Sequence, residues 1–143
     1  MKVLKLFAAI NKIDEERQMV WGTASTESVD SQGEVVKLDA IKGAWEDYMK
    51  FANIREMHSN KAAGTVKEYE FTENAVIIGV HVVDKDAWTK VKEKVYKGFS
   101  IGGKKLEVVM QKVGDVNIPH ITKLLLSEIS LVDRPANPDA MVS

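Results

Sequence analysis

The stretch FSIGGKKLEVVMQKVGDVNIPHITKLLLSEISLV, residues 99–132, decides the fold. It contains two long apolar-rich runs, 99–112 and 119–132, on either side of a turn near Gly114-Asp115. Runs of this kind around a Gly-Asp pair are typical of a long antiparallel hairpin. Facing residue numbers in this hairpin should sum to roughly 228 to 230, so Ser100 is expected opposite residue 128 or 130.

Two more hairpins are expected outside this stretch. Segments 2–10 and 18–26 are β-rich and flank the polar turn NKIDEE. Segments 64–71 and 73–83 predict another hairpin, which turns near Glu73-Asn74. Residues 27–37 mix Asp, Ser and Gly and predict a loop, and residues 53–58 predict a short strand.

Two segments change to a helical period. In each, an aspartate precedes apolar residues that recur at helical spacing, so each aspartate is a candidate N-cap. The caps and apolar faces are Asp39 with Ile41, Trp45, Tyr48 and Ala52, and Asp84 with Trp88, Val91 and Val95. Pro135 and Pro138 end regular structure because proline lacks the N–H that a ladder requires. The elements never alternate β-α-β-α, so we expect a mostly antiparallel sheet or barrel of about seven strands with two surface helices.

Composition narrows the class of protein. The chain has 143 residues and 45% hydrophobic content, which suits one domain over residues 1–143. The formal net charge of −1 favours neither nucleic acid nor an anionic membrane, and the absence of cysteine excludes disulfides and thiolate chemistry. The opening MKVLKLFAAI is short and runs into charged residues, so it predicts a first strand of a cytosolic protein. No cofactor is indicated.

Ser100 lies in GFSIG, which satisfies the G-x-S-x-G pattern of the α/β-hydrolase nucleophile elbow. That elbow needs a strand before the serine and a helix after it, whereas here a predicted helix precedes Ser100 and a predicted strand follows. We reject the α/β-hydrolase assignment but keep the serine as a candidate nucleophile. A serine hydroxyl then needs a neutral imidazole to take its proton.

The chain has three histidines, His58, His81 and His120. His81 lies within the apolar run VIIGVHVV, where a structural role is expected. His120 follows Pro119 and is expected at a loop rim. His58 ends a predicted strand beside small and polar residues that leave room for a substrate, so we predict His58 as the general base.

Glu128 interrupts the most apolar strand of the sequence, LLLSEISLV. A buried carboxylate costs several kcal/mol, roughly, unless it is paired, so Glu128 is predicted to orient His58. The alternative is a salt bridge with Arg134 or Lys123. Gly102 and Gly103 would allow close approach of backbone and substrate, or form a bulge. Arg134 and Gly102 are candidate oxyanion donors.

Three segments together resemble the prohead maturation proteases of tailed phages, in particular the XkdF-like serine protease domain. They are REMHSNKAAGTV, DKDAWTKVKEKVYKGFSIGG and LLLSEISLVDRPANPDA, and the similarity runs from about Val20 to Ala140. The resemblance implies an assemblin-like fold, a β-barrel flanked by helices that is shared with herpesvirus capsid proteases.

The resemblance also implies a serine endopeptidase that acts in the host cytoplasm, inside the immature procapsid. Its implied partners are scaffold and major capsid proteins as substrates, and further copies of itself in a homodimer or higher oligomer. Ser100 matches the family nucleophile, His58 the histidine, and Glu128 an acidic position often taken as the third member. In many relatives an acidic residue follows the histidine, whereas this chain has Ser59. Relatives can carry longer C-terminal tails, so two alternatives are open: a trimmed domain that lacks a C-terminal extension, or a self-processed product.

Two other interpretations stay open at this point. The first is a β-barrel that has lost catalysis and binds scaffold or capsid protein. The second is a divalent metal site made by His58, His120 and Glu128, although no short ligand spacing such as H-E-x-x-H supports it.

Overall fold

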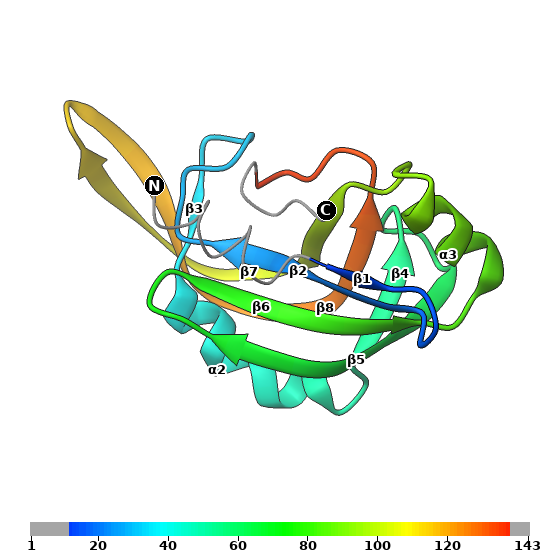
Figure 1. The fold of residues 1–143 in the computed structure, drawn as a ribbon. Coiled ribbons are helices and arrows are strands. Elements are labelled where there is room, and N and C mark those ends of the chain that lie inside the picture. Colours follow the sequence, from blue (N-terminus) through cyan, green and yellow to red (C-terminus); the bar gives the residue numbers. More distant parts are fainter. Residues whose placement is uncertain (1–11, 138–143) are drawn as a thin grey trace.

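The computed structural model describes residues 12–137, which form one mixed sheet and two helices (Figure 1). The elements in chain order are β1 (Ile13–Asp14), β2 (Met19–Thr26), β3 (Val35–Val36), α2 (Leu38–Met49), β4 (Asn53–Glu56), β5 (Ala62–Phe71), β6 (Ala75–Val82), α3 (Lys85–Lys92), β7 (Gly98–Val113) and β8 (Val116–Val132). The predicted strand at 2–10 lies outside the described residues. None of the helices within 12–137 is long and apolar enough to cross a membrane.

The sheet has eight strands in the order β1-β2-β6-β5-β4-β8-β3, and β7 pairs with β8. The prediction of a mainly β protein with two helices is confirmed. The sheet is not closed, however, because β2 and β7 lie close together but share no ladder in the described chain. It is also not wholly antiparallel, since β3 and β4 both pair with β8 in parallel. Helix α2 connects these two short strands, which run along the same edge of β8.

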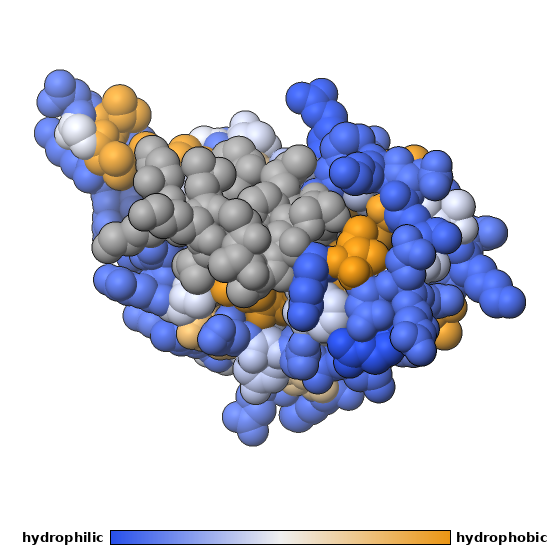
Figure 2. Space-filling model, viewed as in Figure 1, coloured by the Kyte–Doolittle hydropathy of each residue, from blue (hydrophilic) through white to orange (hydrophobic). Residues whose placement is uncertain are grey.

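The β7–β8 hairpin is confirmed with the predicted register. Gly98 faces Val132, Ser100 faces Ser130 and Gly102 faces Glu128, and the chain turns at Gly114, whose φ is 66°. Residues 106–119, here called the arm, project from the rest of the molecule (Figure 1). Hydrophobic side chains gather near the tip of the arm (Figure 2). Those that are exposed on it are Leu106, Val108, Val109, Met110, Val113 and Val116.

The two helices differ in how they begin. Helix α3 starts as predicted, because the Asp84 side chain accepts a hydrogen bond from the Ala87 N–H. The Asp39 cap is wrong: α2 begins at Leu38, so Asp39 lies within its first turn, and Glu27 from the preceding loop accepts a hydrogen bond from the Leu38 N–H. Glu27 therefore caps the N-terminus of α2 from outside the helix.

The core lies between the curved sheet and the helices. Trp45 of α2 and Trp88 of α3 are both buried, as their helical spacing predicts. Phe99 and Leu131 face each other across the β7–β8 ladder and are fully buried. Burial of a side chain of this size contributes about 1.5–3 kcal/mol. These residues are the chain neighbours of Ser100 and Ser130, so the core fixes the strands on which the polar residues sit.

Candidate active site

His58 lies in a tight turn just beyond β4. The predicted strand 53–58 ends at Glu56, and Met57 and His58 both adopt left-handed backbone angles, with φ of 54° and 55°. Such angles cost about 1–3 kcal/mol for residues other than glycine and persist only when the surroundings hold them. Here the Met57 N–H donates to the Leu131 carbonyl at 2.9 Å, and the His58 N–H donates to Ser130 Oγ at 2.9 Å. The turn is therefore tied to β8.

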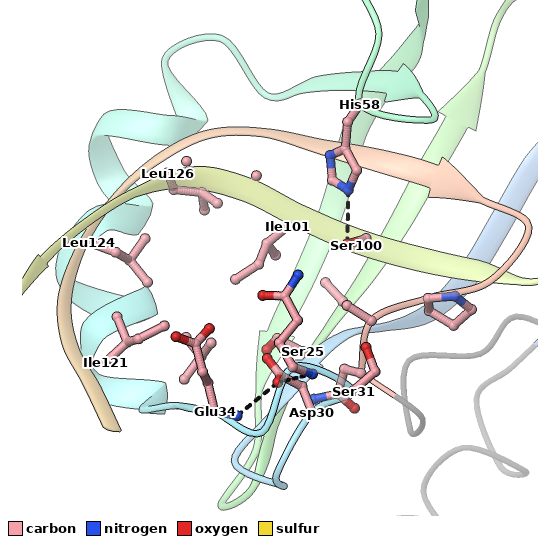
Figure 3. Close-up of a pocket in the computed structure, with 18 of the residues that line it drawn as sticks. Ser25, Asp30, Ser31, Glu34, His58, Ser100, Ile101, Ile121, Leu124 and Leu126 are labelled. Atoms are coloured by element: carbon pink, nitrogen blue, oxygen red, sulfur yellow. Dashed lines mark hydrogen bonds between the residues drawn. The ribbon is translucent and has the colours of Figure 1, made fainter. Parts of the chain in front are cut away.

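Ser100 lies near the start of β7 and points toward the imidazole of His58 (Figure 3). Its Oγ is 3.0 Å from His58 Nε2, a hydrogen-bonding distance. Ser100 is buried, whereas the side chain of His58 is 42% exposed. The hydroxyl and the imidazole can therefore exchange a proton at a position that a substrate can reach.

Glu128 lies on β8, on the other side of the imidazole from Ser100. Its Oε2 is 2.5 Å from His58 Nδ1, and its Oε1 accepts a hydrogen bond from Ser130 Oγ at 2.5 Å. The side chain is 7% exposed, so the cost of burying the carboxylate is offset by these two partners. Among the ion pairs of residues 12–137, Glu128 is paired with His58 and not with Arg134 or Lys123.

Steric constraints explain why glycine occupies both position 102 and position 103. A Cβ on Gly102 would lie 1.9 Å from Glu128 Oε2, and a Cβ on Gly103 would lie 1.8 Å from the Leu125 carbonyl oxygen. The ladder also shifts register between these two residues. Gly102 thus makes room for the carboxylate, and Gly103 lets the two backbones approach at the bulge.

A pocket of about 650 Å³ opens beside Ser100 and His58 (Figure 3). It lies between β7 and the end of β2, where the sheet is not closed. Its apolar wall is formed by Val36, Ile101, Ile121, Leu124 and Leu126. The opposite side is a polar loop that contains Asp30 and Glu34, in which Asp30 Oδ1 accepts hydrogen bonds from the Gln32 and Glu34 N–H groups. Arg134, the predicted oxyanion donor, is exposed and also lines this pocket.

The other two histidines lie away from Ser100. His81 is half-buried on β6, between β2 and β5. His120 does not lie at a loop rim as predicted but within β8, where it is buried and its Nδ1 is 2.9 Å from the Ile118 carbonyl oxygen. The loop-rim prediction is wrong because β8 begins at Val116, so His120 is four residues inside the strand. Residues 12–137 contain no cluster of three or more potential metal ligands.

Two residues near the site are missed by the sequence analysis, Ser130 and Glu56. Glu56 is 2% exposed and ends β4, two residues before His58. Its Oε1 accepts a hydrogen bond from the Tyr96 hydroxyl at 2.6 Å, while Lys61 and Lys90 approach the carboxylate at 3.8 and 3.6 Å. Burial and the Glu56 carboxylate raise the pKa of Tyr96. This contact joins the turn that carries His58 to the segment leading into Ser100.

The sequence and the fold were compared with known proteins. The model of a family described as "Putative phage serine protease XkdF" matches residues 7–107. The fold is similar to that in "Structure of the bacteriophage T4 capsid assembly protease, gp21", with a TM-score of 0.65 and 12% identity over 82% of each chain. No curated protein sequence matches significantly.

Proposed function

Since this chain belongs to the phage serine protease family XkdF, we infer that Ser100, His58 and Glu128 are its catalytic residues. The single observation that carries this assignment is the continuous line of contacts from Ser100 Oγ through the His58 ring to Glu128. A hydroxyl, an imidazole and a carboxylate in this order are the groups needed to activate serine as a nucleophile.

In this mechanism the neutral His58 ring carries its proton on Nδ1 and donates it in a hydrogen bond to Glu128. Nε2 then takes the Ser100 proton as Oγ attacks the scissile carbonyl and the new C–O bond forms. Collapse of the tetrahedral intermediate breaks the C–N bond, and His58 returns the proton to the leaving amine. A water molecule, deprotonated by the same imidazole, hydrolyses the acyl-enzyme. Glu128 stabilises the imidazolium that forms in each half.

We propose Arg134 as a donor to the oxyanion, because it lines the pocket beside Ser100 and carries a permanent positive charge. Gly102 is the other candidate donor. A methyl group in place of its hydrogen would lie 1.9 Å from Glu128 Oε2 and 3.1 Å from His58 Nδ1, which supports a spacing role for its lack of side chain. Its N–H stays a candidate donor.

The substrate is proposed to be an extended segment of a scaffold or major capsid protein, cleaved inside the procapsid in the host cytoplasm. The T4 protein of similar fold is a capsid assembly protease, which supports this choice. β7 has β8 along one edge and no ladder partner along the other in the described chain. An extended peptide can add to such an edge. We further propose a partly open barrel that works as a homodimer or higher oligomer.

The test is digestion of scaffold protein and of casein by the purified chain and by Ser100→Ala, with Ser127→Ala as a matched control on an exposed serine. A fluorophosphonate probe should label Ser100 in the wild-type protein and in the control, because unactivated serines do not react. Equal cleavage by wild type and Ser100→Ala would contradict the assignment of the nucleophile. Absence of both cleavage and labelling would favour a module that binds scaffold without cutting it.

A further inference from the structure

We propose that Ser130 is a positioning residue that holds the general base and the acid in one arrangement. The inference rests on the proposed function, because it assigns Ser130 a part in the same site. Ser130 has no solvent-exposed surface, and its hydroxyl contacts both members of the pair. Its Oγ accepts a hydrogen bond from the His58 N–H at 2.9 Å and donates one to Glu128 Oε1 at 2.5 Å.

The direction of these two hydrogen bonds follows from the groups involved. A backbone N–H can only donate, so Ser130 Oγ accepts from His58. The hydroxyl has one proton, which is then free for Glu128 Oε1. The two bonds are therefore compatible and use different parts of one hydroxyl group. An alanine at this position could satisfy neither partner.

The place of Ser130 in the sheet explains why it can contact both. It faces Ser100 on β7 and Arg55 on β4, so it lies where three strands meet. Glu128 precedes it by two residues and therefore lies on the same face of β8. The His58 turn passes over that face immediately after β4.

Holding the turn matters because Met57 and His58 both have left-handed backbone angles. Two backbone N–H groups of this turn donate to β8: that of Met57 to the Leu131 carbonyl and that of His58 to Ser130 Oγ. Loss of the hydroxyl would remove the second bond and leave Glu128 Oε1 without its donor. The imidazole would then spend less time aligned with Ser100, which lowers the rate of the chemical step more than substrate binding.

The test compares Ser130→Ala with the matched control Ser127→Ala, an exposed serine on the same strand. We expect Ser130→Ala to lower kcat and the rate of fluorophosphonate labelling of Ser100 by about 10- to 100-fold, with KM little changed. Hydrogen exchange at the His58 amide should accelerate in Ser130→Ala and not in Ser127→Ala. Thermal unfolding verifies that each variant is folded.

A second pair separates the hydroxyl from side-chain shape. Ser130→Thr and Ser130→Val introduce side chains of nearly equal size, and only the threonine keeps the hydroxyl. Higher activity of Ser130→Thr than of Ser130→Val supports the proposal. This comparison tests the role of the hydroxyl even if Ser130→Ala fails to fold. Equal activity of Ser130→Thr and Ser130→Val would overturn the proposal. A Ser130→Ala protein with the kcat and the Ser100 labelling rate of the wild type would overturn it as well. No labelling of Ser100 in the wild-type protein would instead overturn the proposed function and this inference with it.

Discussion

Gly102 and Glu128 face each other across the β7–β8 ladder, and a methyl group on Gly102 would lie 1.9 Å from Glu128 Oε2. The same methyl group would lie 3.1 Å from His58 Nδ1. Real Cβ atoms do not approach an oxygen this closely, so the carboxylate occupies space that only a glycine leaves open. The contact between Glu128 and His58 therefore depends on a residue that has no side chain.

Gly102→Ala should displace the Glu128 carboxylate from His58 and lower kcat by about 100-fold, since a displacement near 1 Å can cost that much. The control is Gly43→Ala on α2, where a Cβ meets nothing within 4 Å. That change should leave activity intact and raise helix stability by about 0.5–1 kcal/mol. Steady-state kinetics and urea unfolding of both variants provide the comparison. An active Gly102→Ala protein would show that the carboxylate can move without cost to catalysis.

Glu128→Gln should lower kcat by about 100-fold or more, because an uncharged amide cannot stabilise the imidazolium of His58 and can present its NH₂ group to Nδ1. Its shape is nearly unchanged, so KM and thermal stability should change little. Glu107→Gln on the arm is the matched control, since Glu107 is exposed and its partner is Thr122. Wild-type kcat in Glu128→Gln would remove Glu128 from the mechanism.

Stability at alkaline pH should depend on Tyr96, whose pKa is raised by burial and by the Glu56 carboxylate. Above its ordinary pKa of about 10, the unfolded state loses the proton while the folded state keeps it. The folded state then binds more protons, so the free energy of unfolding falls as pH rises, by about 1.4 kcal/mol per pH unit for one such group. Below about pH 10 the contribution of Tyr96 to the free energy of unfolding is fully present.

Tyr96→Phe should show a shallower alkaline decline in urea unfolding followed from about pH 9 to about 11.5, together with lower stability at neutral pH because Glu56 loses its donor. Burial also raises the pKa of Tyr48, so some decline should persist in the variant. An identical slope in both proteins would mean that Tyr96 ionises as readily in the folded chain as in the unfolded one.

Asp84→Ala should lower the free energy of unfolding by about 1 kcal/mol, because the side chain of Asp84 caps α3 through the Ala87 N–H. Asp86→Ala is the control: Asp86 lies in the first turn of the same helix but is not its cap residue. It should lose only the smaller interaction with the helix dipole, about 0.3–1 kcal/mol. Equal losses in the two variants would assign the effect to charge and not to the cap.

The sequence predicted the parts of the site that depend on local pairing. The hairpin around Gly114-Asp115 put Ser100 opposite residue 128 or 130, and in the structure it faces Ser130, with Glu128 two residues away on the same face. Glu128 stood out because a carboxylate within an apolar strand needs a partner. These signals lie in one continuous stretch of chain, so no long-range information was needed to use them.

The position of His58 could not be derived in the same way. It depends on the parallel pairing of β4 with β8, which joins segments far apart in the chain and leaves no turn signal between them. Ser130 was missed because a serine in a strand does not stand out by itself. The available signal was its spacing of two residues from Glu128, which puts both on one face. Glu56 gave a similar signal, since Ile54 and Glu56 share the buried face of β4.

β8 is the last strand described in the chain, and it contributes Glu128 and Ser130 while pairing with both β4 and β7. The groups that hold the imidazole therefore arrive only when this strand docks between two that were synthesised earlier. Before β8 docks, Ser100 has no strand opposite it that carries Glu128 and holds the His58 turn. In the proposed mechanism, activation of Ser100 therefore requires β8, and a nascent chain would acquire the catalytic arrangement only after β8 has been translated.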